Sequence, residues 1–312
     1  MKQKYEGKKK SLSQSLIRDN VEFLFLSLPA IILLLIFSYW PIYGLVIAFK
    51  KFNPILGIGG SKWCGLDNFK FFFQSSDFMR VTRNTVCYGI SFLVLGTSAA
   101  VVLALLFYNL RNKVALKAYN TIVILPKFMS MVLIAYVVYA ILNPVSGVLN
   151  RVLMMFGVKS IDWYSTPSAW PVILNIINLW SSIGMNSVLY YAALMGIDLA
   201  LFEAAAIDGA NKLQSTIHIA IPHLWSIISI TSILAIGQLF NGDFGLFYQT
   251  TRDVGLLYPT TDIINTYVFR CLQGGEMSAG TAVGLFQSVM GFICIMLANG
   301  IVKKISPENC LF

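Results

Sequence analysis

The most informative stretch of this chain reads EAAAIDGA over residues 203–210 and ends in IAIP over residues 219–222. It is a polar, alanine-rich island between two apolar runs that are each long enough to cross a membrane. Three consecutive alanines favour a helix, and their small side chains leave its surface open to a closely fitting partner. The stretch therefore predicts a helical element that projects from two membrane spans.

The residue types of this island also suggest where its helices begin and end. Residues 199–208 are expected to form a short helix, which Gly209 ends or bends. A second helix is expected from about Asn211 to Ile219, and Pro222 is expected to open the next span, where its missing N–H costs little. An apolar face at helical spacing is expected on the first helix at Leu201, Phe202, Ala205 and Ala206.

Composition places most of the chain away from water. Of its 312 residues 57% are hydrophobic and 12% are charged, whereas soluble domains have about 25% charged residues. The net charge of +9 fits lysines and arginines gathered at membrane surfaces, so no nucleic-acid partner is expected. The five cysteines are scattered without a CxxC pair, which disfavours a disulfide framework or a metal site.

Apolar runs recur along the chain and are interpreted as helices, because backbone polar groups in lipid must be satisfied within the segment. The sequence thus predicts an all-α membrane protein with about six transmembrane helices. Pro41 and Gly44 should kink or break the first of them near its end. The expected spans cover about residues 23–49, 85–110, 122–142, 170–197, 223–240 and 280–301.

The distribution of basic residues indicates how the spans are oriented. Residues 1–20 form a basic segment that we interpret as a cytoplasmic tail, followed by a membrane domain over residues 21–312. With six spans both termini share one side, and placing that side in the cytoplasm gives it a small excess of lysine and arginine. The positive-inside rule therefore predicts that both termini are cytoplasmic.

The island resembles the EAA loop of binding-protein-dependent ABC importer permeases. That pattern is Glu-Ala-Ala, three residues, Gly, nine residues, Ile, one residue and Leu-Pro, and this chain keeps the spacing with Ile221 in place of Leu. The resemblance implies the MetI-like permease fold of type I ABC importers and a cytoplasmic coupling loop over residues 198–222. A bland alternative is an amphipathic loop that only joins two spans. The residues implied to dock the ATPase are Glu203, Ala204, Ala205, Asp208, Gly209 and Pro222.

Other segments resemble the LplB-type permeases, which are assigned to polysaccharide and complex-oligosaccharide uptake in Gram-positive and related bacteria. Two departures stand out: Lys127 occupies a position that is often His in these permeases, and residues 254–260 are not assigned to a pattern of this family. The similar segments are residues 37–50, WCGLDNF at 63–69, RNT at 83–85, LPKF at 125–128, DIINTYVFR at 262–270 and TAVGLF at 281–286.

This resemblance implies a set of partners in a bacterial plasma membrane. The chain would pair with a second homologous permease and with two copies of an ATPase subunit. An extracellular solute-binding lipoprotein would deliver the carbohydrate. The chain has no P-loop pattern, so ATP and Mg²⁺ are expected in the ATPase and no cofactor in this chain, which is not expected to be an enzyme.

Polar residues inside spans are costly and usually face a bundle interior or a cavity. Asn175, Asn178 and Ser182 share one face of the fourth span at spacings of i, i+3 and i+7, and Gln238 lies at the outer end of the fifth. We expect these four to line a solute pathway. The alternative is that they form hydrogen bonds between helices.

Rival functions lack the residues that they need. A secondary transporter should carry ionisable residues within its spans, whereas the acidic residues here lie almost wholly in loops and tails. A membrane enzyme should show a catalytic cluster, yet His218 and His223 have no partner set for metal or catalysis, and Arg270 and Glu276 are expected to be solvated or structurally paired. An importer permease for a non-sugar solute stays open as an alternative.

Overall fold

The computed structural model describes residues 23–110 and 112–305 and divides into two units, Met1–Asn68 and Phe69–Phe312. The predicted tail over residues 1–20 and the last residues of the chain lie outside the described ranges. In the described part, five helices are long and apolar enough to cross a membrane, and a bent helix pair makes a sixth. The predicted all-α membrane fold is confirmed.

The first unit contains the first span, Phe23–Phe49. Its α-helix widens to a π-helix over η1 (Leu35–Tyr39) and then tightens to a 3₁₀-helix over η2 (Trp40–Phe49). Pro41 explains this change, because proline has no N–H to donate and its ring crowds the preceding turn. The irregularity predicted near the end of this span is therefore present.

A small hairpin follows the first span. Strand β1 (Lys50–Lys51) pairs antiparallel with β2 (Lys62–Trp63) around the short helix α2 (Gly57–Gly60). The ring of Trp63 stacks on Phe49 at 5.8 Å between centroids, and Asn68 Nδ2 donates to the carbonyl oxygens of Ala48 (2.8 Å) and Lys50 (3.1 Å). The WCGLDNF segment thus fastens the end of the first span.

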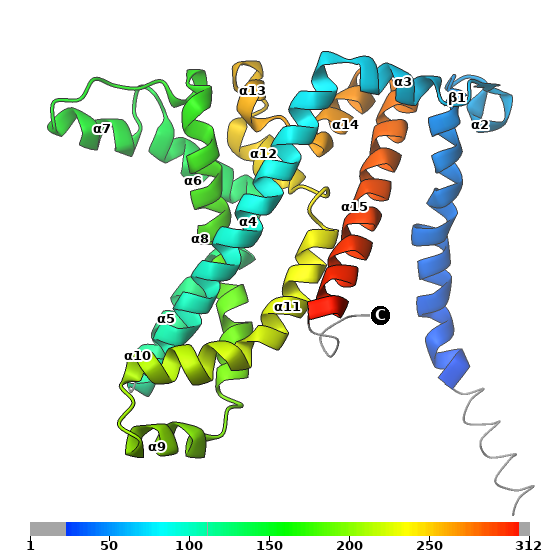
Figure 1. Ribbon diagram of the computed structural model, residues 1–312. Coiled ribbons are helices and arrows are strands. Elements are labelled where there is room, and N and C mark those ends of the chain that lie inside the picture. The colour runs from blue at the N-terminus through cyan, green and yellow to red at the C-terminus, as the bar shows by residue number, and fades with distance from the viewer. Residues whose placement is uncertain (1–22, 111, 306–312) are drawn as a thin grey trace, which may run out of the picture. The chain divides into compact units, whose positions relative to one another are not determined.

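The second unit is a helical bundle built around α4 (Ser76–Asn109), which packs along α8 (Trp170–Leu194) (Figure 1). Helix α11 (Ile221–Gly237) packs against α15 (Met277–Ile305). Glycines permit two close crossings: a Cβ on Gly184 of α8 would come within 2.1 Å of the Val123 oxygen, and a Cβ on Gly291 within 3.2 Å of the Gly237 oxygen.

The third predicted span is broken, so the expectation of one helix over residues 122–142 is wrong. Helix α5 (Lys113–Ile124) runs through the 3₁₀-turn η3 (Leu125–Phe128) and is followed by α6 (Met131–Leu142) at a bend of 101°. Pro126 opens the turn, and Ser130 caps the new helix by accepting from the Leu133 N–H at 3.3 Å. A proline followed by a strong N-cap residue favours such a break.

Pro222 does not open a separate span. The helix continues without interruption from α10 (Lys212–Ser215) through the π-segment η6 (Thr216–Ala220) into α11. The π-turn lets the Ile221 N–H bond to the Thr216 oxygen, which accommodates the N–H that Pro222 lacks. The second helix of the island and the fifth span are therefore one bent helix, Lys212–Gly237.

Short helices connect the spans at the end of the bundle opposite α9 (Figure 1). The loop between α6 and α8 carries α7 (Val148–Met155), η4 (Trp163–Ser165) and η5 (Pro167–Ala169). The other elements at this end are α3 (Asp67–Gln74), α12 (Phe244–Thr251), η7 (Gly255–Leu257), α13 (Tyr258–Thr261) and α14 (Ile264–Gln273).

Candidate functional site

The island of residues 198–222, called the coupling element below, is a helix–turn–helix. Helix α9 (Leu199–Ile207) starts at Asp198, whose side chain accepts from the Ala200 N–H at 3.0 Å. It ends at Gly209, which has a φ of +81° that glycine adopts without the strain a Cβ would bring. Asn211 and Gln214 then form a reciprocal capping box that starts α10. The predicted short helix and its glycine end are confirmed.

One side of α9 packs on the bundle and the other sides face solvent. The Phe202 ring lies 5.8 Å from the Tyr108 ring of α4, and Ala205 is half-buried. Leu201 and Ala206 are exposed, so the four-residue apolar face predicted for this helix is only half right. Phe202 and Ala205 face the bundle, whereas Leu201 and Ala206 face outward. Helix α9 therefore leaves an apolar surface uncovered.

The residues implied to dock an ATPase fall mainly on this open side. Ala205 is half-buried, and the other implied residues are exposed: Glu203, Ala204, Asp208, Gly209 and Pro222. Residues that the motif does not mark add most of the apolar area, namely Leu199 (66% exposed), Ile207 (87%) and Leu213 (68%). Their apolar character in a polar island was the signal that could have found them.

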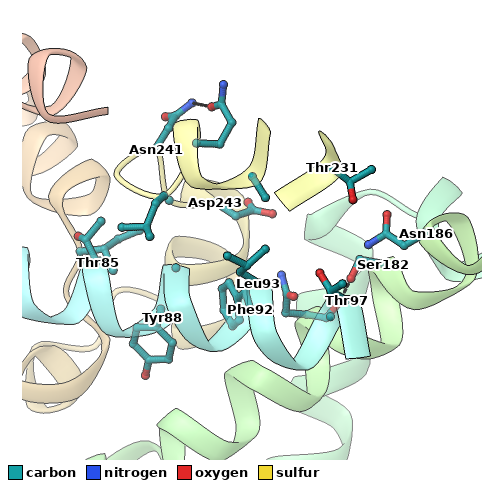
Figure 2. Close-up of a pocket in the computed structure, with 18 of the residues that line it drawn as sticks. Thr85, Tyr88, Phe92, Leu93, Thr97, Ser182, Asn186, Thr231, Asn241 and Asp243 are labelled. Atoms are coloured by element: carbon teal, nitrogen blue, oxygen red, sulfur yellow. Dashed lines mark hydrogen bonds between the residues drawn. The ribbon is translucent and has the colours of Figure 1, made fainter. Parts of the chain in front are cut away.

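A cavity of about 360 Å³ with a mixed polar and apolar lining lies between α4, α8, α11 and the start of α12 (Figure 2). Three of the four predicted pathway residues line it: Asn178, Ser182 and Gln238. Asn175 does not, because its side chain is bonded to Ser91 of α4 and to the Pro171 oxygen. The other polar side chains on the lining are Thr85, Tyr88, Thr97, Asn186, Tyr190, Thr231, Asn241 and Asp243.

Neutral amides and hydroxyls make up nearly all of the polar groups on this lining. Asn241 Nδ2 donates to Gln238 Oε1 (3.0 Å), and Gln287 Nε2 donates to Asn241 Oδ1 (3.2 Å), so three amides form a chain. Asp243 is the one charged residue among the described lining residues, and its Oδ1 caps α12 by accepting from the Leu246 N–H at 2.9 Å. Asn186 follows Ser182 by four residues, a helical spacing that could have identified it.

Aromatic rings complete the cavity. Tyr88, Phe92 and Phe247 line it, and the rings of Tyr88 and Phe247 lie 4.7 Å apart. A cavity with apolar rings and a few orienting polar groups is typical of small-molecule sites. Such a lining can exchange hydrogen bonds with hydroxyl groups and cover the apolar faces of a ring-shaped solute.

A buried ion cluster closes the end of the bundle opposite the coupling element. The Asp262 carboxylate has no exposed surface and is paired with Arg80 (2.8 Å) and Arg270 (2.6 Å). Burial lowers the pKa of Arg270, but the hydrogen bonds and charge of Asp262 outweigh it, so the net pKa is raised. Arg270 also lies 4.1 Å from the centre of the Tyr258 ring. The expectation that Arg270 is structurally paired is confirmed.

The loop that contains Asp262, residues 259–264, is hydrogen-bonded directly to α4. Asn84 Nδ2 donates to the main-chain oxygen of Asp262 at 2.9 Å, and the Tyr88 hydroxyl donates to the main-chain oxygen of Thr260 at 2.8 Å. Thr85 Oγ1 accepts from the Ile264 N–H at 3.0 Å. The RNT and DIINTYVFR segments of the sequence therefore meet in space. We call Arg80, Asn84, Asp262 and Arg270 the outer latch.

No group of three or more histidines, cysteines or acidic residues that could hold a metal ion occurs in residues 23–110 and 112–305. The fold, the cavity within it and the exposed helical element at one end define a membrane transport subunit.

Residues 85–307 match the family described as the binding-protein-dependent transport system inner membrane component, and the chain belongs to this family. The chain is 34% identical to protein LplB of Bacillus subtilis (strain 168), over 97% of this chain and 95% of that protein. It is 33% identical to the polygalacturonan/rhamnogalacturonan transport system permease protein YteP of the same organism, over 97% of this chain and 94% of the other. The resemblance drawn from the sequence is confirmed.

Solved structures show the same fold. A chain of a bacterial ABC transporter involved in the import of the acidic polysaccharide alginate superposes with a TM-score of 0.85 and 33% identity, covering 95% of this chain and 99% of its own. A second structure holds a bacterial alginate ABC transporter in complex with an alginate pentasaccharide-bound periplasmic protein (TM-score 0.84, 32% identity, 94% and 97% coverage). This protein is therefore a permease subunit of an ABC transport system in a bacterial plasma membrane.

Proposed function

We propose that this permease carries a carbohydrate, an oligosaccharide or polysaccharide fragment, delivered by an extracellular binding lipoprotein. The cavity supports this proposal, because its amides, hydroxyls and aromatic rings match the mixed polar and apolar surface of a sugar. The relatives named above for polygalacturonan/rhamnogalacturonan transport and for alginate import support the same class. The alternative is a non-sugar solute.

The coupling element would receive force from a separate ATPase that holds ATP and Mg²⁺. The observation that carries this proposal is the exposed apolar surface of Leu199, Ile207 and Leu213 on a helix–turn–helix that joins two spans. Exposed apolar patches rimmed by polar residues commonly mark protein interfaces. Glu203 and Asp208 at the rim would meet polar or basic groups of the partner.

Movement of this element would act directly on the cavity. Helix α8 enters the element and the bent helix Lys212–Gly237 leaves it, and these helices bear Asn178, Ser182 and Gln238. ATPase closure would open the pathway to the outside to take the solute, and hydrolysis would reset it inward. Asn175 lines a separate pocket together with Arg83 and Asn84, and it stays a predicted pathway residue.

Co-purification tests the docking proposal. The permease is expressed with its partner permease and ATPase, and the double variant Leu199→Asp with Leu213→Asp is compared with Leu256→Asp, an exposed leucine in η7 at the other end (64% exposed). The double variant should lose the ATPase while Leu256→Asp retains it. Equal recovery of the ATPase with both variants would refute the docking surface.

Uptake tests the solute class. Cells that express the complete transporter are supplied with labelled neutral and acidic oligosaccharides and with labelled amino acids and polyols. Saturable uptake of a saccharide that depends on the ATPase supports the proposal. Uptake restricted to a non-saccharide solute would assign the cavity to that solute instead.

A further inference from the structure

The loop between α6 and α8 is held by one buried amide. Asn150 of α7 is 1% exposed; its Nδ2 donates to the oxygens of Pro144 (3.2 Å) and Ile161 (2.8 Å). Its Oδ1 accepts from the Ile161 N–H (3.2 Å) and from Trp163 Nε1 (3.1 Å). An amide whose donors and acceptor are all engaged fixes the segments around it, so α7 is presented in a defined orientation.

The side of α7 away from Asn150 is apolar and open. Val148, Val152 and Met155 follow one another at spacings of four and three residues, and they are 57%, 42% and 84% exposed. Phe156, directly after the helix, is 81% exposed. Residues at this spacing share one face of a helix, and a contiguous open apolar face of this kind indicates a surface that is covered in the working protein.

The position of α7 in the chain indicates what covers it. It lies between the end of α6 at Leu142 and the span that begins at Pro167, where two spans leave the bilayer. Figure 1 shows it to the side of α6, with its axis roughly perpendicular to that of α6. Exposed apolar residues on α6, Tyr136 (70%) and Ile141 (41%), lead up to it.

Basic residues flank the apolar face. Arg151 lies on α7 and Lys159 follows it, and both are exposed. Helices that lie in the plane of a membrane surface combine an apolar face with lysine and arginine, whose charged ends reach lipid phosphates while their stems stay in the apolar zone. A soluble protein partner would not require this continuity with the spans.

We propose that α7 is an interfacial membrane anchor. The face formed by Val148, Val152, Met155 and Phe156 is buried at the boundary of headgroups and acyl chains, and Arg151 and Lys159 face lipid phosphates. The Asn150 hub transmits this fixed height to the end of α6 through Pro144 and to the segment that leads into α8 through Ile161 and Trp163. The inference needs only the membrane location, and is independent of the solute and of the ATPase.

Depth-sensitive labelling of the assembled transporter tests the anchor. The five native cysteines are replaced in a background that keeps uptake, and single cysteines are placed at Val152 or at Met154. These positions are matched in exposure, 42% and 49%, but lie on nearly opposite sides of α7. Each is labelled with an environment-sensitive fluorophore and reconstituted in phosphatidylcholine–phosphatidylglycerol vesicles.

The label at Val152 should be quenched by nitroxide lipids at least about threefold more than by aqueous iodide, with the reverse order at Met154. Adding Val148→Glu and Phe156→Glu should shift the Val152 label toward iodide quenching, whereas Arg151→Gln should shift it less. If both labels are quenched by iodide alone, the anchor is refuted. If the Val152 label becomes protected only when the binding protein is added, the face belongs to a protein interface and the anchor is likewise refuted.

Discussion

At one end of the second unit the Asp262 carboxylate is fully buried and paired with Arg80 and Arg270, whereas at the other end Ile207 and Leu213 of the coupling element are 87% and 68% exposed. The outer latch pairs its charged groups within the chain. The coupling element satisfies its helix ends by caps but leaves its apolar side chains uncovered. The latch end makes its contacts within this chain, whereas the coupling element has the composition of a surface that binds a second protein.

The contrast also concerns how each end is joined to the cavity. The loop 259–264 is bonded to α4 through Asn84 of the latch and through the neighbouring Thr85 and Tyr88, and Thr85 and Tyr88 line the cavity. The coupling element is joined to it by α8, by the bent helix Lys212–Gly237 and by the contact of Phe202 with Tyr108 of α4. A push at the coupling element is therefore expected to move helices against a fixed outer loop.

The largest effect on stability is expected at the latch. Asp262→Ala leaves two partly buried arginines without their shared carboxylate, and should lower the free energy of unfolding by about 3 kcal/mol. Asp253→Ala is the control, because Asp253 lies 3.4 Å from Arg270, accepts from the Tyr258 hydroxyl at 3.0 Å and is partly exposed; it should cost less than Asp262→Ala, about 1–2 kcal/mol. Thermal unfolding of the purified permease in detergent measures both, and equal losses would contradict the role given to the latch.

A smaller effect is expected where the coupling element touches the bundle. Phe202→Ala removes the half-buried ring that packs on Tyr108 and should cost about 1–2 kcal/mol. Leu201→Ala, one residue away and exposed, should change stability by less than about 0.5 kcal/mol. The same unfolding measurement applies. A larger loss at Leu201 than at Phe202 would mean that α9 packs through its other side.

The turn of the coupling element should be still less sensitive. Gly209→Ala forces a Cβ onto a residue with φ +81°, which costs about 1 kcal/mol, and it should impair uptake more than stability. Gly284→Ala adds a Cβ into open space on α15, so stability should be unchanged or higher. Uptake and unfolding are measured on both variants, and normal uptake in Gly209→Ala would show that the bend is not required.

The cavity residues should matter least for stability and most for transport. The double variant Asn178→Ala with Ser182→Ala should change stability by under about 1 kcal/mol but reduce uptake at least about tenfold. Ser187→Ala is matched in chemistry on the same helix; Ser187 is buried outside the cavity and bonded to the Gly184 oxygen. Uptake that falls equally in both would point to helix packing, the alternative that the sequence left open.

Local chemistry predicted the coupling element well, because caps, alanines and a glycine end act within a few residues. The sequence could not tell that Phe202 and Ala205, but not Leu201 and Ala206, face the bundle, since that depends on where α4 lies. The breaks at Pro126 and the π-turn before Pro222 show the same limit. A proline predicts an irregularity, but tertiary packing decides whether the helix ends, bends or continues.

The cavity and the latch show which long-range features escape a single sequence. Spacing on one helix grouped Asn175 with Asn178 and Ser182. In the structure Asn175 is hydrogen-bonded to Ser91 of α4 and does not line the cavity. Asp262 and Arg80 are separated by 182 residues, and no periodicity relates them. The sequence marked only the segments RNT (83–85) and DIINTYVFR (262–270). That these two segments contact each other is seen only in the folded structure.

Sided labelling tests the central claim, that the coupling element lies in the cytosol and the outer latch outside. Asp208→Cys and, as its counterpart beside the latch, Glu276→Cys are introduced separately, and a membrane-impermeant maleimide is added to intact cells and to inverted vesicles. We expect Glu276→Cys to react in intact cells and Asp208→Cys only in inverted vesicles. Reaction of Asp208→Cys in intact cells would place the element outside and contradict its coupling to an ATPase.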